Sequence, residues 1–320
     1  MLLILPRNLT AWVNRDIKML DSLKWRKLTL AFILLAIPLF FIGGPSSVSL
    51  DIFRRFWDLG HSIFFFLVAI NLVWWRIVKT PKQFLIAFIA LVFVSLLIEK
   101  LQTYVGREAS WLDVLANIAG LLLGYSVTQS SSRLIVFLRG LSLIALMPGL
   151  WGFFKSAALG FILWQQFPLL SGGDFAWESH AWGGTGEIAR VASLENSSRV
   201  YLARYSGEAY QSVDMMGFMQ SWKGYQQLIV EIENPTTETF SLILRISDKE
   251  HELSAQDYSD RFNRRLTLLP GWNTIEVNIS DIENAPGNRT MNLQEIYLLK
   301  LFLPESGKAR EIYLNKIYLR

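Results

Sequence analysis

The sequence predicts an α-helical membrane bundle of five transmembrane helices followed by an all-β jelly roll or β-sandwich. Of the 320 residues, 52% are hydrophobic and only 18% are charged, a balance too apolar for a wholly soluble protein. Long apolar runs fill the first half of the chain, whereas short runs of alternating apolar and polar residues fill the second. The two halves therefore differ in hydrophobic period as well as in composition.

The apolar runs indicate five membrane spans within a bundle that covers residues 28–154. They comprise residues 28–42, 59–75, 84–98, 111–127 and 134–154. Several runs are shorter than the roughly 20 residues that cross a hydrocarbon core, so basic flanking side chains such as Lys27 and Lys100 are expected to extend them. Residues 155–173 are expected to form an interfacial helix and a Ser-Gly-Gly linker, or the fifth span continues as a longer, tilted helix.

Basic residues predict the orientation of the spans. The segment 1–27 and the loops after the second and fourth spans carry most of the lysines and arginines that flank the bundle. The positive-inside rule then places the N-terminal segment in the cytoplasm, and five spans place the C-terminal domain outside the cytoplasmic membrane. The formal net charge of +4 gives no reason to expect a nucleic-acid partner, and the lipid bilayer is the expected surrounding.

Residues 174–320 show the alternation of half-buried antiparallel strands. Apolar residues occupy every second position around Val230, Leu244 and Val277, and two further runs cover residues 295–303 and 311–319. Turn signals such as Asn234-Pro235 separate these runs. The C-terminal domain is therefore expected to be a β-sandwich or jelly roll.

Polar residues gather at the span ends that the topology places on the outer side. They form three pairs at helical spacing, Asp58 with His61, Glu99 with Gln102, and Asp113 with Asn117. Arg107 lies in the short loop between the second and third pairs, near enough to pair with a carboxylate. Gly120 and Gly124 extend the face of Asp113 and would allow a neighbouring helix to approach closely.

This polar cluster has a functional and a structural interpretation. Ionisable groups at membrane depth are costly and mark functional sites by default. Asp58 and Asp113 could instead simply cap helix N-termini, although capping explains neither His61 nor Glu99. A divalent metal held by His61, Glu99 and Asp113 is conceivable, but no dedicated ligand spacing supports it; the metal and any other cofactor stay unknown.

Over residues 28–128, this pattern resembles the VanZ-like membrane proteins. The resemblance is carried by Asp58-x-x-His61, Glu99-Lys100-Leu101-Gln102, Gly106-Arg107 and Asp113-x-x-x-Asn117-x-x-Gly120-x-x-x-Gly124. It implies a role in the cell envelope without a settled biochemical activity. The fifth span and the β domain lie outside it, so a role in glycopeptide resistance does not follow.

The C-terminal domain contains two aromatic turn motifs, Trp222-Lys223-Gly224-Tyr225 and Pro270-Gly271-Trp272-Asn273, and a closing pair of strands. With these features it is similar to galactose-binding-like jelly rolls, the fold of many carbohydrate-binding modules. Aromatic rings suit sugars because they stack on the apolar face of a pyranose. Trp222 and Trp272 adjoin strands and are expected in the core. The candidates for exposed, ligand-binding aromatic residues are Trp177, Trp182, Tyr205 and Tyr210.

A second polar constellation lies in one connection between strands. It contains Asp248, His251, Asp260, Arg261 and Asn263. These residues form either a ligand-binding group or a solvated loop with a local Asp–Arg pair, which would contribute little stability. No nucleophile triad or phosphate-binding loop is recognisable in the sequence.

Three hypotheses follow. The leading one is a cell-envelope membrane protein whose outer domain recognises a glycan or envelope polysaccharide. The second is a membrane-embedded enzyme that acts on a lipid-linked saccharide, with His61, Glu99 or Asp113 as general acid or base and Arg107 on a phosphate. The third is a scaffold that docks another envelope protein. The sequence leaves open whether the protein is an enzyme.

Overall fold

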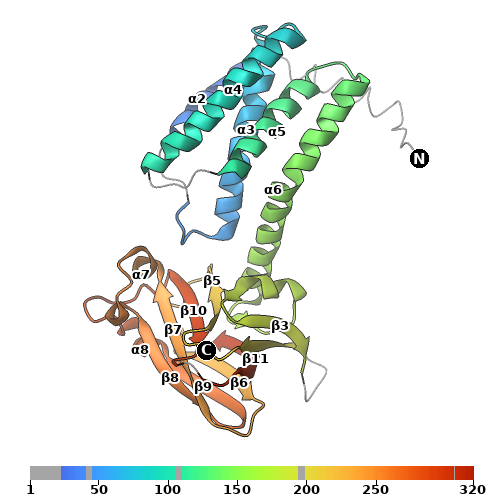
Figure 1. Cartoon of the computed structure of the whole chain (residues 1–320). Coiled ribbons are helices and arrows are strands. Elements are labelled where there is room, and N and C mark those ends of the chain that lie inside the picture. Colours follow the sequence, from blue (N-terminus) through green and yellow to red (C-terminus); the bar gives the residue numbers. More distant parts are fainter. Residues whose placement is uncertain (1–22, 41–44, 106–109, 194–198, 306) are drawn as a thin grey trace. The chain divides into compact units, whose positions relative to one another are not determined.

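The computed structural model describes residues 23–40, 45–105, 110–193, 199–305 and 307–320. The chain forms two compact units. The first consists of Met1–Ser46 and Phe53–Phe154, and the second consists of Ser47–Ile52 and Lys155–Arg320. The elements are labelled in Figure 1. Most of the predicted N-terminal segment 1–27 lies outside the described residues.

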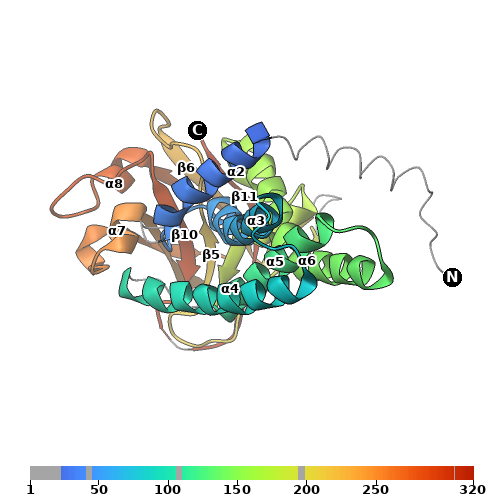
Figure 2. The same cartoon turned by 90° about the horizontal axis from the view of Figure 1, so that it is seen from above.

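The first unit is helical. Its elements are α2 (Leu23–Ala36), η1 (Ile37–Phe40), α3 (Asp51–Trp74), α4 (Pro81–Gln102), η2 (Thr103–Val105), α5 (Trp111–Val127) and the start of α6 (Arg133–Gln166). Local sequence explains where these helices begin. Thr80 caps α4 in a capping box with Gln83 and is followed by Pro81 at the first helical position. The side chain of Ser110 caps α5. Figure 2 shows α3 between α2 on one side and α4 and α5 on the other.

Three described helices are long and apolar enough to cross a membrane, namely α3, α4 and α6. The helix α5 is apolar but has only 17 residues, and α2 has 14. The five predicted spans are therefore not confirmed. The run 28–42 differs most from its prediction because α2 ends at Ala36, before Ile37-Pro38, where the proline disfavours helical backbone in the preceding residue. The predicted fifth span and interfacial helix form one helix, α6, with Pro148 inside it.

Two glycines bring α3 and α5 into close contact, as the sequence predicts. A Cβ atom at Gly120 would lie 2.3 Å from the carbonyl oxygen of Ser62, and one at Gly124 would lie 2.3 Å from that of Phe66. Both obstacles are backbone atoms of α3, so neither can move aside without moving the helix. Around this contact, Phe65 and Leu121 are completely buried. The close approach fixes the position of α3 relative to α5, and both helices contribute residues to the site described below.

The second unit is a sandwich of two antiparallel sheets. The first sheet has the strand order β3 (Glu187–Ala192), β4 (Arg199–Tyr205), β11 (Arg310–Leu319), β6 (Gln227–Asn234) and β9 (Gly271–Asn278), with β1 (Leu169–Ser171) also paired to β11. The second sheet has the order β2 (Trp182–Gly184), β5 (Ser212–Met216), β10 (Ile296–Phe302), β7 (Phe240–Asp248) and β8 (Phe262–Leu268). Short helices η3 (Ala176–Ala181), α7 (Lys249–Leu253), η4 (Tyr258–Asp260) and α8 (Ile279–Glu283) lie in the connections. The predicted β-sandwich is confirmed.

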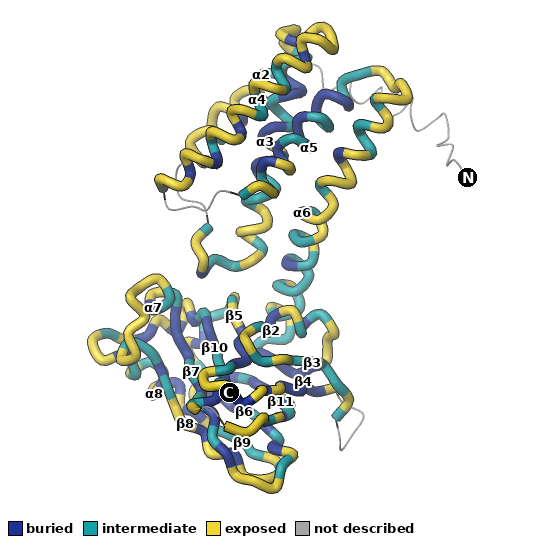
Figure 3. The backbone as a smooth tube through the Cα atoms, viewed as in Figure 1, coloured by how far each residue is buried: buried dark blue, intermediate teal, exposed yellow. Residues whose placement is uncertain are grey.

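The alternating residues of both sheets build one core. Val230 and Ile232 of β6, Leu242 and Leu244 of β7, and Leu301 of β10 are completely buried in it. Figure 3 shows this contrast in burial, with buried stretches along the strands and extensive exposed stretches along the helices. Because the core draws its residues from Leu170 to Leu319, the second unit carries its own hydrophobic stabilisation.

The start of this unit differs from the predicted boundary at residue 174. Ser171, Gly172 and Gly173 are buried rather than exposed as a linker. The buried carboxylate of Glu178 holds them, because its Oε1 accepts hydrogen bonds from Ser171 Oγ (2.6 Å) and Gly172 N (2.9 Å). Gly173 has a φ of 73°, and a Cβ there would lie 2.6 Å from the carbonyl oxygen of Arg199. A soluble fragment should therefore begin at Lys155, where the compact unit resumes, and not at Asp174.

Candidate functional site

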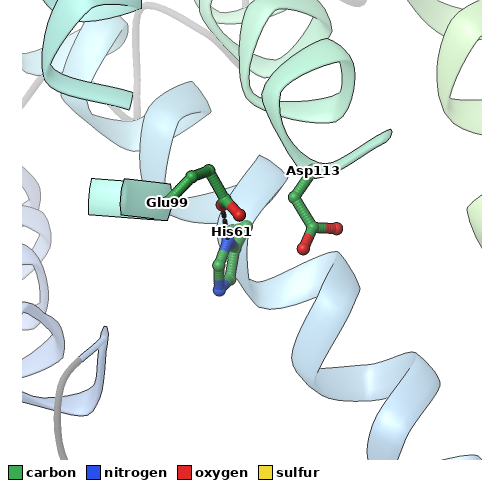
Figure 4. A group of neighbouring side chains, drawn as sticks. All are labelled: His61, Glu99 and Asp113. Atoms are coloured by element: carbon green, nitrogen blue, oxygen red, sulfur yellow. Dashed lines mark ion pairs between the residues drawn. The ribbon is translucent and has the colours of Figure 1, made fainter. Parts of the chain in front are cut away.

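Three ionisable side chains of the helical unit converge, as the sequence predicts. His61 of α3, Glu99 of α4 and Asp113 of α5 each have one ring nitrogen or carboxylate oxygen that lies within 4.8 Å of those of the other two residues (Figure 4). His61 Nδ1 lies 3.8 Å from Glu99 Oε1, beyond hydrogen-bond range but close enough for an ion pair. His61 and Glu99 are each 3% exposed, and Asp113 is half-buried. The three helices thus place one imidazole and two carboxylates together in an apolar bundle.

Neighbouring groups fix the orientation of this cluster. The backbone N–H of Ser110 donates a hydrogen bond to Glu99 Oε2 at 3.0 Å, which leaves Oε1 as the oxygen that faces His61. The ring of Phe40 packs edge-on against the imidazole, with centroids 4.8 Å apart. Gln102 Nε2 donates to the carbonyl oxygen of Phe40 at 3.2 Å. Gln102, a predicted ligand-binding residue, therefore has a positional role in the structure.

A second polar layer lies one helical turn along α4 and α5. Asn117 Nδ2 donates to Ser95 Oγ at 2.8 Å, and both residues are completely buried. Asn117 follows Asp113 by four residues and Ser95 precedes Glu99 by four, so each lies on the same helix face as its charged neighbour. Asn117, the other predicted ligand-binding residue of the bundle, thus ties α5 to α4 beside the cluster. Nothing in the structure tests whether Gln102 or Asn117 contacts a ligand.

The other two predicted members of the cluster have different outcomes. Asp58 lies on α3 one turn before His61 and is half-buried, outside the group of converging donor atoms. Arg107 lies outside the described residues. The capping interpretation is wrong for Asp58, because α3 begins at Asp51 and not at Asp58. Asp113 is not the capping residue of α5, which is Ser110, but it lies in the first turn, where the helix dipole favours a carboxylate.

Three residues of the predicted loop constellation, Asp248, His251 and Asp260, belong to a partly buried ion-pair network. Asp248 is completely buried and caps α7, where its Oδ1 accepts from His251 N at 3.0 Å. Arg289 binds both of its oxygens, at 2.6 and 2.8 Å, and also donates to Asp260 at 2.7 Å. His251 Nδ1 lies 3.2 Å from Asp260 Oδ2. The solvated-loop interpretation is therefore wrong, and Arg289, which the sequence analysis missed, is the centre of the network.

The network determines the ionisation of its members. Burial alone would raise the pKa of Asp248, but hydrogen bonds from Arg289, Asn292 N and His251 N outweigh it and hold the pKa below its usual value. Hydrogen bonds from Arg289 also lower the pKa of Asp260, although burial opposes them. Both carboxylates in turn raise the pKa of the Arg289 guanidinium. With each Asp248 oxygen accepting two hydrogen bonds, this residue is suited to a structural role and not to proton transfer.

These lowered pKa values predict that acid destabilises the sandwich. A carboxyl group whose pKa is depressed on folding stabilises the protein above its unfolded pKa, about 3.9 for Asp, and this stabilisation is lost as the pH falls through the folded pKa. We expect the free energy of unfolding of the fragment 155–320 to fall between pH 5 and pH 3, measured by urea denaturation. The fall should be smaller in Arg289→Gln, which lacks the cation that depresses both pKa values. Equal falls in the two proteins would contradict this role of Arg289.

Arg261 and Asn263 belong to a different neighbourhood from the Arg289 network. The guanidinium of Arg261 lies over the ring of Tyr258, 5.2 Å from its centroid. Burial lowers the pKa of Arg261, and the nearby charge of Arg245 lowers it further. Asn263 pairs with Arg245 in the register of β7 and β8. The five loop residues therefore divide into a network around Arg289 and a separate group beside Arg245.

The predicted aromatic residues are only partly where the sequence analysis expects them. The expected exposure of Trp182 and Tyr205 is wrong, because both are core residues, 7% and 1% exposed. Trp177 is half-buried against His180, with ring centroids 6.2 Å apart. Tyr210 is 71% exposed, which confirms its predicted accessibility.

The two tryptophans that were expected in the core have opposite outcomes. Trp222 is completely buried, which confirms the prediction. Trp272 is 41% exposed, so its expected burial is wrong. Its neighbours in β9 explain the difference, since Ile275 and Val277 pack on the core at odd-numbered positions and direct Trp272 to the opposite face.

Trp272 belongs to the outer face of the first sheet, which the sequence analysis missed as a candidate site. Register places Tyr313, Glu233 and Trp272 in one row across β11, β6 and β9. Five further residues of these strands lie on the same face: Asn315 and Tyr318 of β11, Glu231 of β6, and Thr274 and Glu276 of β9. These eight residues of β11, β6 and β9 are half-buried or exposed, whereas Ile229, between Tyr318 and Glu276, and Leu202 of β4, which pairs with Tyr313, are buried on the same face.

The outer face of the second sheet has a different character. Its charged groups already pair with one another: Lys300 with Asp214 at 3.1 Å, and Arg245 with Glu252 at 2.6 Å. Ser247 donates to the same Glu252 carboxylate. Tyr210 lies beside this sheet with its ring 6.2 Å from that of Phe302. The charged groups named on the second sheet are thus paired with one another within that sheet and its connections.

No family model matches the chain, and no curated protein matches it, so the VanZ-like resemblance has no support from a family model. Among solved structures, a family 11 carbohydrate-binding module of Clostridium thermocellum in complex with a β-1,3-1,4-mixed-linked tetrasaccharide is 14% identical, with a TM-score of 0.38, and covers 47% of this chain and 93% of that chain. An exo-β-agarase is 8% identical with a TM-score of 0.36, over 44% of this chain and 23% of that chain. The family 11 module of a cellulosomal cellulase from Clostridium thermocellum is 12% identical with a TM-score of 0.33, over 43% of this chain and 86% of that chain. TM-scores and identities this low carry no argument about function. The assignment of the second unit as a β-sandwich rests on its own strand pairing.

Proposed function

We propose that the protein is a membrane-anchored envelope protein that recognises a glycan through the outer face of its first sheet. The observation that carries this proposal is the row of Tyr313, Glu233 and Trp272 across three paired strands. Neighbouring strands lie about 4.8 Å apart, so the two rings are separated by about 10 Å along one direction of the sheet. Two platforms at this spacing suit successive units of an oligosaccharide rather than a single small ligand.

The polar groups around the rings suit sugar hydroxyls. Glu231, Glu233 and Glu276 offer carboxylate acceptors, and Thr274 offers a hydroxyl that can donate or accept. Asn315 Nδ2 holds Glu231 Oε2 at 2.7 Å, so this carboxylate is fixed in position before any ligand arrives. Aromatic rings that are only partly buried, with polar groups fixed beside them, satisfy both the apolar face and the hydroxyl edge of a pyranose.

Membrane anchorage is the second part of the proposal. Along α4, Leu85, Ile89 and Phe93 are 56%, 61% and 68% exposed, and such apolar side chains would be better accommodated by lipid than by water. The helices α3 and α6 are likewise long enough to span a bilayer. The distribution of basic residues supports a cytoplasmic N-terminus and an extracytoplasmic sandwich, where envelope glycans would be its partners.

Glycan binding by the full chain in detergent micelles tests the main proposal. The panel should contain neutral polysaccharides, among them β-1,3-1,4-mixed-linked glucan and agarose, and acidic polysaccharides of cell walls. We expect Trp272→Ala and Tyr313→Ala each to weaken binding of the best polymer about tenfold, which corresponds to about 1.4 kcal/mol. The physical reason is the loss of one stacking platform in each variant.

Tyr210→Ala is the matched control, because it removes an exposed ring that lies beside the other sheet. It should bind like the wild-type protein. If Tyr210→Ala weakens binding while Trp272→Ala does not, the first sheet is not the recognition face. Capture of an envelope protein without binding to any polymer would favour the docking scaffold instead.

A second function, catalysis on a lipid-linked saccharide, is supported by the convergence of His61, Glu99 and Asp113. An imidazole beside two carboxylates can accept and return a proton. In this case Glu99→Gln, which removes the charge and keeps the shape, should abolish turnover of a lipid-linked saccharide without reducing membrane insertion. Loss of insertion would assign Glu99 a structural role.

A further inference from the structure

We propose that His61, Glu99 and Asp113 form a binding site for one divalent transition-metal ion of the Zn²⁺ type. This site lies in the helical unit, so it is independent of glycan recognition by the sandwich. The three side chains come from three different helices and present three donor atoms within 4.8 Å of one another. Two of the three residues are 3% exposed, so the ligands are not surface groups that meet by chance.

The distances fit a metal centre after a small adjustment. Zn²⁺ binds imidazole nitrogen and carboxylate oxygen at about 2.0–2.2 Å, so two ligand atoms on one ion lie at most about 4.4 Å apart. The separation of His61 Nδ1 from Glu99 Oε1, 3.8 Å, is already within this limit. The upper bound of 4.8 Å for the group exceeds this limit by a few tenths of an ångström, so ion binding requires only a small movement of the ligand atoms.

The donor set favours a transition metal over Mg²⁺ or Ca²⁺. Those hard ions prefer sites made only of oxygen, whereas an imidazole nitrogen suits Zn²⁺ and its neighbours in the first transition series. In an apolar bundle of low dielectric, a bound divalent cation would stabilise the two carboxylates more than it would in water.

Surrounding groups give the site the support that metal ligands require. Glu99 is oriented by the N–H of Ser110, so one oxygen is fixed and the other faces His61. Asn117 Oδ1 is completely buried one turn from Asp113, and among the described residues no group donates a hydrogen bond to it. A buried acceptor one helical turn from a ligand is suited to a water molecule bound to the ion. Three protein ligands leave a coordination position for such a water or for a substrate, as in catalytic zinc sites.

The test is metal content of the full chain, purified in detergent with its affinity tag removed, incubated with Zn²⁺ and then dialysed. Mass spectrometry of the metal should find about one Zn²⁺ per wild-type chain and less than about a tenth of that in His61→Ala and in Glu99→Gln. Glu99→Gln preserves side-chain volume, so it tests the ligand even where His61→Ala fails to fold. Addition of EDTA to the wild-type protein should lower its melting temperature, as expected when a bound ion is removed.

His180→Ala is the matched control, since His180 is an exposed histidine in the sandwich, and it should keep the wild-type metal content. Less than about a tenth of an equivalent in the wild-type protein would overturn the proposal. Wild-type content in both His61→Ala and Glu99→Gln would also overturn it, because the ion would then be bound elsewhere. If a variant loses zinc but binds glycan as the wild-type protein does, the metal site and the glycan-binding face are independent of each other.

Discussion

Replacing Arg289 by Gln is expected to lower the free energy of unfolding of the sandwich by about 3–5 kcal/mol. The substitution leaves Asp248 completely buried without its counter-ion, and uncompensated buried charges cost this much. The measurement is urea denaturation of the fragment 155–320 at pH 7, followed by tryptophan fluorescence.

Arg204→Gln is the control for this experiment. Arg204 pairs with Glu311 at 2.7 Å, but both side chains are about half exposed, so solvent screens the pair and the variant should be nearly as stable as the wild-type fragment. Similar losses in the two variants would mean that burial does not govern the contribution of these ion pairs. A loss below about 1 kcal/mol in Arg289→Gln would contradict the structural role of its network.

Replacing Gly120 by Ala is expected to destabilise the helical unit by about 1–3 kcal/mol or more. The new Cβ atom would lie 2.3 Å from the Ser62 carbonyl oxygen and 3.3 Å from the Phe66 nitrogen, both backbone atoms of α3. The helices must therefore separate, which also displaces His61 from Asp113. The melting temperature of the full chain in detergent, followed by size-exclusion chromatography after heating, measures the loss.

Gly140→Ala provides the comparison, because a Cβ there meets nothing within 4 Å. Alanine also favours helix over glycine by about 1 kcal/mol, so this variant should match or exceed wild-type stability. If Gly120→Ala is as stable as Gly140→Ala, the close approach of α3 and α5 is not required for the fold.

The sequence predicted the class of both units because hydrophobic period is a local property. The alternation around Val230 and Leu244 predicted strands that the structure confirms as β6 and β7. Helix ends were less predictable. The start of α3 was placed at Asp58 rather than Asp51, because its first turns carry Arg54 and Arg55 and do not read as an apolar run. The prediction that Ser-Gly-Gly forms an exposed linker was wrong. The burial of this segment depends on the contact of Ser171 with Glu178, which no local pattern in the sequence reveals.

The candidate sites could be predicted where local spacing in the sequence grouped their residues, and not where only the fold brings the residues together. His61, Glu99 and Asp113 could be grouped because each lies at the end of an apolar run and pairs with a polar residue at helical spacing. Arg289 could not be linked to Asp248, because 41 residues separate them and only the folded sheet brings them together. Trp272 was expected in the core because it follows a turn next to a strand. Its outward direction could have been recognised from the alternation with Ile275 and Val277.

The central proposal is that the outer face of the first sheet recognises a glycan, and nuclear magnetic resonance tests it most directly. The fragment 155–320, labelled with ¹⁵N, would be titrated with an oligosaccharide of the polymer that binds best. We expect the largest chemical-shift changes at the Trp272 indole and at the amides of Glu233, Tyr313 and Thr274. Chemical-shift changes confined to the second sheet, around Tyr210, Asp214 and Lys300, would contradict the proposal. The absence of any change would also contradict it, provided that the spectrum shows the fragment to be folded.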